Sequence, residues 1–343
     1  MPPPRDPVAD LKRIGFLLEA AQEPGYRVRA FRTAAATLAG LTAEELAERV
    51  RNGSLRELTG IGEVTERTIL ESLRGEEPVY LRRLESTGGR PLEEGAAELR
   101  AALRGDLHAH TLASDGGATI REMAETAIEL GHEYLVISDH SPRLTVANGL
   151  SPERLRAQLD EIAALNTELA PFRILTGIEV DINEDGTLDQ EPDLLSRLDV
   201  VVGSVHSALR MEPRAMTRRM VAALADPRLD VLGHITGRMK TRKRNRPEST
   251  FDAEIVFAAA ARFDKAIEVN SRPERLDPPK RLLRLAIEAG CRVSIDSDAH
   301  APGQLAWLGN GCERAFLCGV TPDRIVNALG AEALLEWTAS HEA

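Results

Sequence analysis

Hydrophobic residues in the first part of the chain recur at the spacing of amphipathic helices. In residues 8–21, Leu11, Ile14 and Leu18 fall on one face, and residues 26–38 repeat the pattern. Such spacing predicts helices that each bury one side.

Two further helices are predicted downstream of these. Thr42 followed by Glu45 has the spacing of a capping box, which marks the start of a third helix. Residues 63–73 again have helical spacing. We therefore expect residues 1–87 to form a small all-helical domain.

The pattern changes after residue 103, where short apolar, β-branched runs alternate with helical stretches such as residues 120–130 and 152–169. Short apolar runs of this kind are typical of buried parallel strands. The runs end near residues 107, 138, 181, 205, 233, 270 and 295. Seven strand–helix repeats predict an α/β fold, a seven-stranded β/α barrel rather than an open sheet.

A stretch rich in Gly and Pro, residues 87–91, separates the two patterns and predicts a linker. We expect the helical domain over residues 1–87, a linker over 88–102 that ends in a helical segment, and the barrel over 103–335. A chain of 343 residues is long enough for two such domains.

Charge and composition limit the classes of function. The net charge of −11 argues against nucleic-acid binding through overall charge. The three cysteines form no CxxC pair, which is typical of a reducing compartment. Without an apolar leader or an apolar run of about 20 residues, we expect a cytoplasmic protein with no membrane partner.

Six of the eight histidines follow a predicted strand directly or after a short turn. They are His108, His110, His140, His206, His234 and His300. Side chains at the carboxyl ends of parallel strands converge on one mouth of a barrel. Imidazoles with neighbouring carboxylates suit zinc, manganese or iron, so the repeat predicts a metal site.

The motifs around these histidines resemble the polymerase-and-histidinol-phosphatase (PHP) domain, in the version attached to bacterial family X DNA polymerases. They span Asp106 to Thr111, Ser138 to His140, Gly177 to Asp181, Gly203 to His206, Leu232 to His234 and Asp296 to His300. The resemblance covers nearly all of residues 103–330. It implies a distorted seven-stranded barrel with a three-metal centre.

By position, the resemblance implies three groups of ligands. They are His108, His110, Glu179 and Asp298; Glu179 again with His206 and His234; and Asp115 with His140 and His300. The family's chemistry would be attack of metal-activated water on a phosphoester, with Glu179 and Asp298 as catalytic residues. The cofactors would be three manganese or zinc ions, with iron as the alternative, and no organic cofactor.

The N-terminal region resembles a second part of the same polymerases. Gly60, Ile61 and Gly62 lie between two helices, as in a helix-hairpin-helix motif that binds a DNA phosphate through backbone N–H groups. The alternative is a Gly-rich helix connection without a ligand. Residues 26–35 also resemble the N-terminal helical domain of these polymerases, which grips the 5′ side of a DNA gap. Only about 15 residues separate this region from the first metal motif, too few for the polymerase palm and fingers.

Several basic residues are candidates for binding phosphate or the DNA backbone. They are Arg143, Arg238, Lys240, Arg242, Lys243, Arg244, Arg272 and Arg275. A basic run over residues 238–246 directly follows one of the histidines, in an otherwise acidic chain. The alternative is an ordinary solvated loop.

Other polar residues have lesser expected roles. Asp181, Asn270 and Asp139 are expected either to orient the ligands or to cap strand ends. We expect His132 on the surface and Trp307 to pack in the interior.

These features support three hypotheses about function. The first is a metal-dependent phosphoesterase acting on DNA, as a 3′-5′ exonuclease or in 3′-end processing during repair. The second is a small-molecule phosphomonoesterase of the histidinol-phosphatase type, which leaves the hairpin without a purpose. The third is a non-catalytic DNA-end-binding protein, which leaves the complete ligand set without a purpose.

Overall fold

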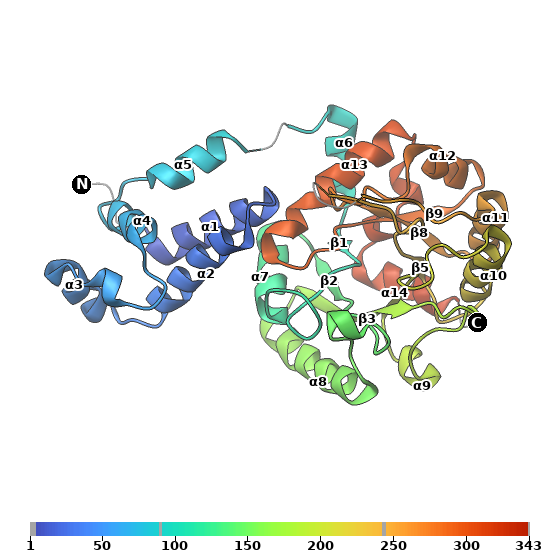
Figure 1. Ribbon diagram of the computed structural model, residues 1–343, viewed down its shortest axis with the longest axis horizontal. Helices are drawn as coiled ribbons and strands as arrows, with labels where there is room; N and C mark the ends of the chain where they lie inside the picture. The colour runs from blue at the N-terminus through green and yellow to red at the C-terminus, as the bar shows by residue number, and fades with distance from the viewer. Residues whose placement is uncertain (1–4, 89–90, 242–244, 342–343) are drawn as a thin grey trace. The chain divides into compact units, whose positions relative to one another are not determined.

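The computed structural model describes residues 5–88, 91–241 and 245–341, and these fall into two compact units. The N-terminal unit spans Met1–Pro91 and the C-terminal unit spans Leu92–Ala343. Figure 1 labels their helices and strands.

The N-terminal unit is all-helical, as the hydrophobic pattern predicts. Its elements are α1 (Pro7–Ala20), α2 (Gly25–Ala39), α3 (Ala43–Asn52), η1 (Leu55–Glu57), α4 (Glu63–Leu73) and α5 (Val79–Ser86). The predicted capping box starts α3, because the Glu45 carboxylate accepts from the Thr42 N–H at 2.8 Å. Leu11, Ile14 and Ile69 lie fully buried in the single core of this unit.

The turn before α4 requires a glycine at position 60. Gly60 has a φ of +81°, and a Cβ there would lie 2.4 Å from Thr33 Cγ2. The Thr37 hydroxyl donates to the Thr59 carbonyl at 2.8 Å, which ties the same turn to α2. The turn is therefore held close against α2.

The C-terminal unit is the predicted seven-stranded β/α barrel. All pairings in its seven-stranded sheet are parallel. In sheet order the strands are β1 (Gly105–Asp106), β2 (Tyr134–Ile137), β3 (Arg173–Asp181), β4 (Val200–Ser204), β5 (Val231–Leu232), β8 (Ala266–Asn270) and β9 (Arg292–Asp296). A parallel bridge between Ala109 and Ala299 brings the two edges together beyond β1 and β9, so the barrel is nearly closed.

Helices surround the sheet in Figure 1. They are α6 (Glu94–Ala102), α7 (Ile120–Glu129), α8 (Pro152–Leu169), α9 (Pro192–Leu195), α10 (Pro213–Leu224), α11 (Ala253–Arg262), α12 (Lys280–Glu288), α13 (Leu308–Leu317) and α14 (Ala331–Ala339). Short 3₁₀ segments are η2 (Thr145–Ala147), η3 (Pro302–Trp307), η4 (Pro322–Arg324) and η5 (Val326–Ala328). After β5 comes an antiparallel pair, β6 (Met239–Lys240) and β7 (Asn245–Arg246).

The expected linker is shorter than the sequence indicates. Helix α6 packs on α13, and Leu99 and Leu103 are buried in a core shared with Val269 and Ile295. Residues 92–102 therefore belong to the barrel unit, because α6 covers apolar side chains of β8 and β9. The unit also extends beyond residue 335, since Trp337 is buried against the barrel strands.

The prediction that His132 lies on the surface is wrong, whereas Trp307 is buried as expected. His132 is only 6% exposed, and its Nε2 lies 3.0 Å from Arg100 Nη2 on α6. Burial, and then the charge of Arg100, lowers the pKa of His132 to about 3. The imidazole is buried because α6 folds over it.

This depressed pKa predicts a loss of stability in acid. The unfolded imidazole takes up a proton below about pH 6.5 while the folded one does not, so stability falls as pH decreases from there. Between pH 7 and pH 5 we expect His132 to contribute a loss of about 2 kcal/mol. His132→Gln should remove this part of the pH dependence.

Tryptophan fluorescence during urea unfolding measures the effect, because Trp307 and Trp337 both lie in the C-terminal unit. The difference in unfolding free energy between pH 7 and pH 5 is compared for wild type and variant. An equal loss in both proteins would contradict the role given to His132.

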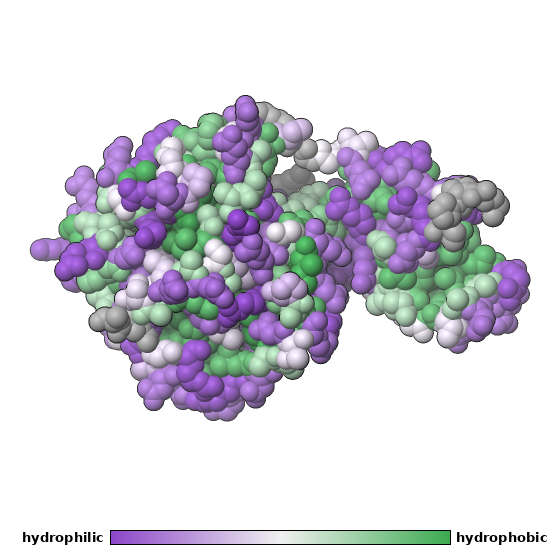
Figure 2. Space-filling model, turned by 180° about the vertical axis from the view of Figure 1, so that it is seen from behind, coloured by the Kyte–Doolittle hydropathy of each residue, from purple (hydrophilic) through white to green (hydrophobic). Residues whose placement is uncertain are grey.

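In the described parts of the chain, no helix is long and apolar enough to cross a membrane. Cys291, Cys312 and Cys318 are buried and free. The space-filling view shows mainly hydrophilic residues, with apolar residues gathered on part of the N-terminal unit (Figure 2).

Candidate metal centre

The structure brings the nine predicted ligands to the carboxyl ends of the barrel strands. His108 and His110 follow β1, His140 follows β2, and Glu179 lies within β3. His206 and His234 each lie two residues after the end of β4 and β5. Asp115 lies in the loop before α7, and Asp298 and His300 follow β9.

Glu179 lies at the centre of this cluster and is 1% exposed. Its Oε1 is 2.8 Å from His234 Nε2 and 3.2 Å from His206 Nε2. Its Oε2 is 2.9 Å from His140 Nδ1 and 3.3 Å from His108 Nε2. One carboxylate thus faces histidines from four strand ends.

Asp298 and Asp115 are carboxylates on other sides of the cluster. Asp298 Oδ1 lies 3.5 Å from His110 Nε2, and Asp298 has a φ of +53° at the turn after β9. Asp115 Oδ1 lies 3.5 Å from His140 Nε2 and 3.4 Å from His300 Nε2. The Asp115 side chain is 37% exposed, so this side of the cluster opens to solvent.

The donor set fits divalent cations. Among the described residues, three groups have ligand atoms within 4.8 Å of one another: His110, Asp115, His140 and His300; His108, His110 and Glu179; and His140, Glu179 and His206. Within the described parts of the chain, buried ring nitrogens of His108, His110, His140, His206 and His234 have no hydrogen-bond partner. Buried imidazole nitrogens without partners are costly unless a cation or water occupies the space between them.

Charges within the cluster favour the ligating forms of several groups. Burial opposes ionisation of Glu179, but the surrounding histidines lower its pKa well below the ordinary value. Burial lowers the pKa of His110, with help from the charges of His300 and His140. Although burial lowers it, Glu179 raises the pKa of His206 to about 9. A cation would compete with a proton for that ring.

Glu268, a fully buried carboxylate on β8, is not among the residues predicted from the sequence. Its Oε1 accepts from His108 Nδ1 at 2.6 Å, and its Oε2 accepts from the His234 backbone N–H. Because a carboxylate accepts here, the His108 proton lies on Nδ1 and Nε2 is left for a cation. The available signal was a glutamate inside an otherwise apolar strand.

Asp181 and Asn270 do contact the cluster, whereas Asp139 supports a loop. Asp181 Oδ1 accepts from the His206 N–H at 3.1 Å, and Asn270 Nδ2 donates to Asp298 at 3.1 Å. Asp139 instead accepts from the Thr111 N–H and hydroxyl at 2.7 and 2.6 Å. It thus fixes the loop that leads to Asp115.

Two predicted phosphate-binding arginines lie at the cluster. Arg275 Nε is 2.9 Å from Asp298 Oδ2, and Arg272 Nη1 is 3.5 Å from Asp298 Oδ1. Burial opposes ionisation of Asp298, but Arg275 and Arg272 lower its pKa well below the ordinary value. Arg275 is 9% exposed, and its Nη1 has no hydrogen-bond partner among the described residues.

The other predicted basic residues have different surroundings. Arg143 Nη1 donates to Asn183 at 2.7 Å, and Arg238 Nε donates to the Arg275 carbonyl at 2.8 Å. Lys240 lies on β6, where its N–H donates to the Glu274 carbonyl at 2.7 Å. Arg242, Lys243 and Arg244 lie outside the described residues.

Comparison with known proteins identifies the barrel unit. Residues 106–272 match the PHP domain family. The chain is 42% identical over 226 residues to the DNA polymerase/3′-5′ exonuclease PolX of Bacillus subtilis, which covers 66% of this chain but only 39% of PolX. It is 27% identical over 234 residues to a probable phosphatase of Thermoanaerobacter, covering 65% of this chain and 89% of that protein.

A solved structure also matches part of the chain. The histidinol phosphate phosphatase of Lactococcus lactis, complexed with zinc, L-histidinol and phosphate, matches with a TM-score of 0.46 and 19% identity. The match covers 64% of this chain and 94% of that one. Residues 106–272 therefore match a PHP domain, and together with the clustered ligands this match identifies a metal-dependent hydrolase.

Proposed function

We propose that this protein is a phosphoesterase that acts on DNA, as a 3′-5′ exonuclease or in processing 3′ ends during repair. The observation that carries the phosphoester chemistry is the convergence of nine potential ligands, with two arginines beside them. That the substrate is DNA is inferred from the relatives and from the N-terminal unit.

In this proposal the cluster holds three divalent cations, manganese or zinc, in the groups that the family resemblance implies. When bound, the cations supply Lewis acidity that activates water and neutralises phosphate charge. Glu179 lies between histidines of the first two groups and would be shared by them. Asp115, with His140 and His300, would complete the third group on the more open side.

The arginines have a separate role. Arg275 and Arg272 share the two oxygens of Asp298, and Arg275 retains a buried Nη1 to which no described residue is hydrogen-bonded. A guanidinium so placed can donate to a phosphate oxygen while it orients Asp298. Arg272 Nη1 also lies 3.3 Å from His300 Nδ1, and His300 in turn lies beside Asp115.

Two observations support DNA over a small phosphate. The relative with 42% identity is named a DNA polymerase/3′-5′ exonuclease, although the matched region is only 39% of it. The N-terminal unit also presents the Gly60–Gly62 turn at the start of α4, where the N-terminal end of the helix could contact a strand, although the Ile61 and Gly62 N–H groups donate to Leu58 and Thr65. The probable phosphatases, one matched over 89% of its length, favour a small phosphomonoester as the second candidate.

A direct assay separates the two candidates. Purified protein is incubated with manganese or zinc and with DNA labelled at the 3′ or 5′ end, alongside a panel of small phosphomonoesters. We expect stepwise loss of nucleotides from the 3′ end. Rising salt should slow this reaction more than hydrolysis of a small ester, because DNA contacts release counterions.

The control is an Asp298→Asn, His300→Asn double variant prepared in the same way. Its inactivity would exclude a contaminating nuclease. Turnover of a small phosphomonoester with DNA left intact would refute the proposal and favour the phosphatase alternative.

A further inference from the structure

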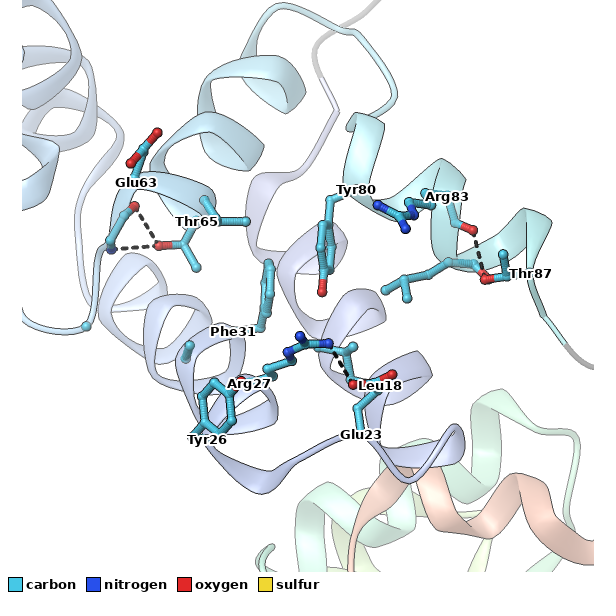
Figure 3. A pocket seen from close by; sticks show the side chains of 15 residues that line it. Leu18, Glu23, Tyr26, Arg27, Phe31, Glu63, Thr65, Tyr80, Arg83 and Thr87 are labelled. Carbon is cyan, nitrogen blue, oxygen red and sulfur yellow. Dashed lines mark hydrogen bonds and ion pairs between the residues drawn. The ribbon is translucent and has the colours of Figure 1, made fainter.

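The N-terminal unit contains an open cavity of about 680 Å³ that the proposed chemistry does not use. Helices α1, α2, α4 and α5 surround it, and Figure 3 shows the side chains that line it. A cavity of this size can hold a ligand as large as a nucleotide.

Aromatic rings form one wall of the cavity. The Phe31 and Tyr80 rings are stacked, with centroids 5.2 Å apart and planes inclined by 19°. Phe31 is buried, Tyr80 is half-buried, and Leu18 and Leu84 continue the apolar surface. Such a surface suits the flat face of another aromatic ring.

The charges around the cavity balance. Arg27 and Arg83 line it, but so do Glu23 and Glu63. Arg27 Nη1 forms an ion pair with Glu23 at 2.8 Å, and Figure 3 shows Arg83 beside Tyr80. Two cations matched by two carboxylates make a poor site for a dianionic terminal phosphate. The planar guanidinium of Arg83 remains suited to stacking on a base or bonding to its edge.

The cavity continues from the turn that we propose contacts a DNA strand. Gly60 and Gly62 line it, and a Cβ at Gly62 would meet nothing within 4 Å. A strand whose backbone lies along this turn would therefore bring an adjacent base to the cavity.

We propose that this cavity binds one unstacked nucleobase of single-stranded DNA, through the Phe31–Tyr80 wall and the rim arginines, and not a terminal phosphate. This inference rests on the proposed function and narrows its substrate to DNA with an unpaired segment. A duplex keeps its bases stacked and cannot offer one without unpairing. Stacking tolerates every base, so little sequence preference is expected.

Fluorescence anisotropy with the full chain tests the inference, in the Asp298→Asn, His300→Asn background so that the probe stays intact. The probes are a short single-stranded oligonucleotide, the same strand with abasic residues throughout, and the duplex. Each carries either a 5′-hydroxyl or a 5′-phosphate. We expect the strand with bases to bind about tenfold more tightly than the abasic strand. The 5′-phosphate should change affinity by less than about twofold.

Two variants test the cavity itself. Tyr80→Leu removes the half-buried ring and should weaken binding of the strand with bases about tenfold, with no effect on the abasic strand. Ala30→Glu places a charged side chain on the exposed rim without removing core packing and should act the same way. Val79→Ala is the matched control on α5, because Val79 is 61% exposed and does not line the cavity.

Equal affinity for abasic and base-containing strands would overturn the inference, as would tight binding that depends on the 5′-phosphate. Binding that survives both cavity variants would also overturn it. The outcome is separable from the proposed function. Base-dependent binding without hydrolysis of DNA would refute only the nuclease proposal, and hydrolysis without base dependence would refute only the cavity.

Discussion

Glu179→Gln should abolish hydrolysis, with a loss in kcat/KM of at least about a thousandfold. Glutamine has nearly the same shape but lacks the negative charge that Glu179 places among His108, His140, His206 and His234. A neutral amide would leave these imidazoles without the anion that draws cations to the cluster. Its NH₂ group would also point a donor at one pair of rings.

A readout other than activity accompanies this prediction. Manganese or zinc at about a hundred times its dissociation constant should stabilise the wild type by about 2.7 kcal/mol. Glu179→Gln should show little of this gain, while its unfolding without metal stays cooperative. Glu168→Gln is the matched control, since the Glu168 side chain is 57% exposed and pairs with Arg121 and not with a histidine of the cluster. Full metal-induced stabilisation of Glu179→Gln would place the metal away from this carboxylate.

Much of the fold and of the candidate site could be predicted because one pattern repeats. His140, His206 and His234 each follow an apolar run within two or three residues, and parallel strands of a barrel end at one mouth. Alternation of such runs with helical spacing was enough to predict seven strands. The ends of the observed strands lie within one residue of the predicted ones, as at Asp181 and Asn270.

What the sequence did not reveal depends on contacts between distant segments. His132 is buried because Arg100 and α6 cover it, and α6 had been placed in a linker. The local sequence of residues 93–104 has the same helical spacing whether that helix is free or packed. Only its contact with α13 distinguishes the two cases.

The role of Glu268 also depends on contacts between distant segments. It lies within the apolar run of β8, and its two partners are separated from it by 160 and 34 positions in the sequence. No short motif links a carboxylate to histidines so far away. A charge inside a buried strand is nevertheless informative, because charged residues are almost never fully buried unless they are paired.

Glu268→Gln should therefore weaken metal binding about 10- to 100-fold while leaving the cluster assembled. The amide can still accept from one donor, but it lacks the charge that holds the proton on His108 Nδ1. His108 would then change tautomer more readily, which places a proton on the nitrogen that faces Glu179. The expected defect is thus in the metal concentration needed for activity.

Metal titration distinguishes this positioning role from that of a ligand. At saturating metal, Glu268→Gln should recover most of its kcat, whereas Glu179→Gln should recover almost none. If Glu268→Gln needs no more metal than the wild type, Glu268 only supports the backbone after β5. If its kcat is not recovered at saturating metal, this carboxylate takes a direct part in the chemistry.

Asn270→Asp changes a neighbour of Glu268, because Asn270 Nδ2 contacts both Glu268 and Asp298. The variant would add a negative charge beside two carboxylates and remove a donor, so it should lower activity even at saturating metal.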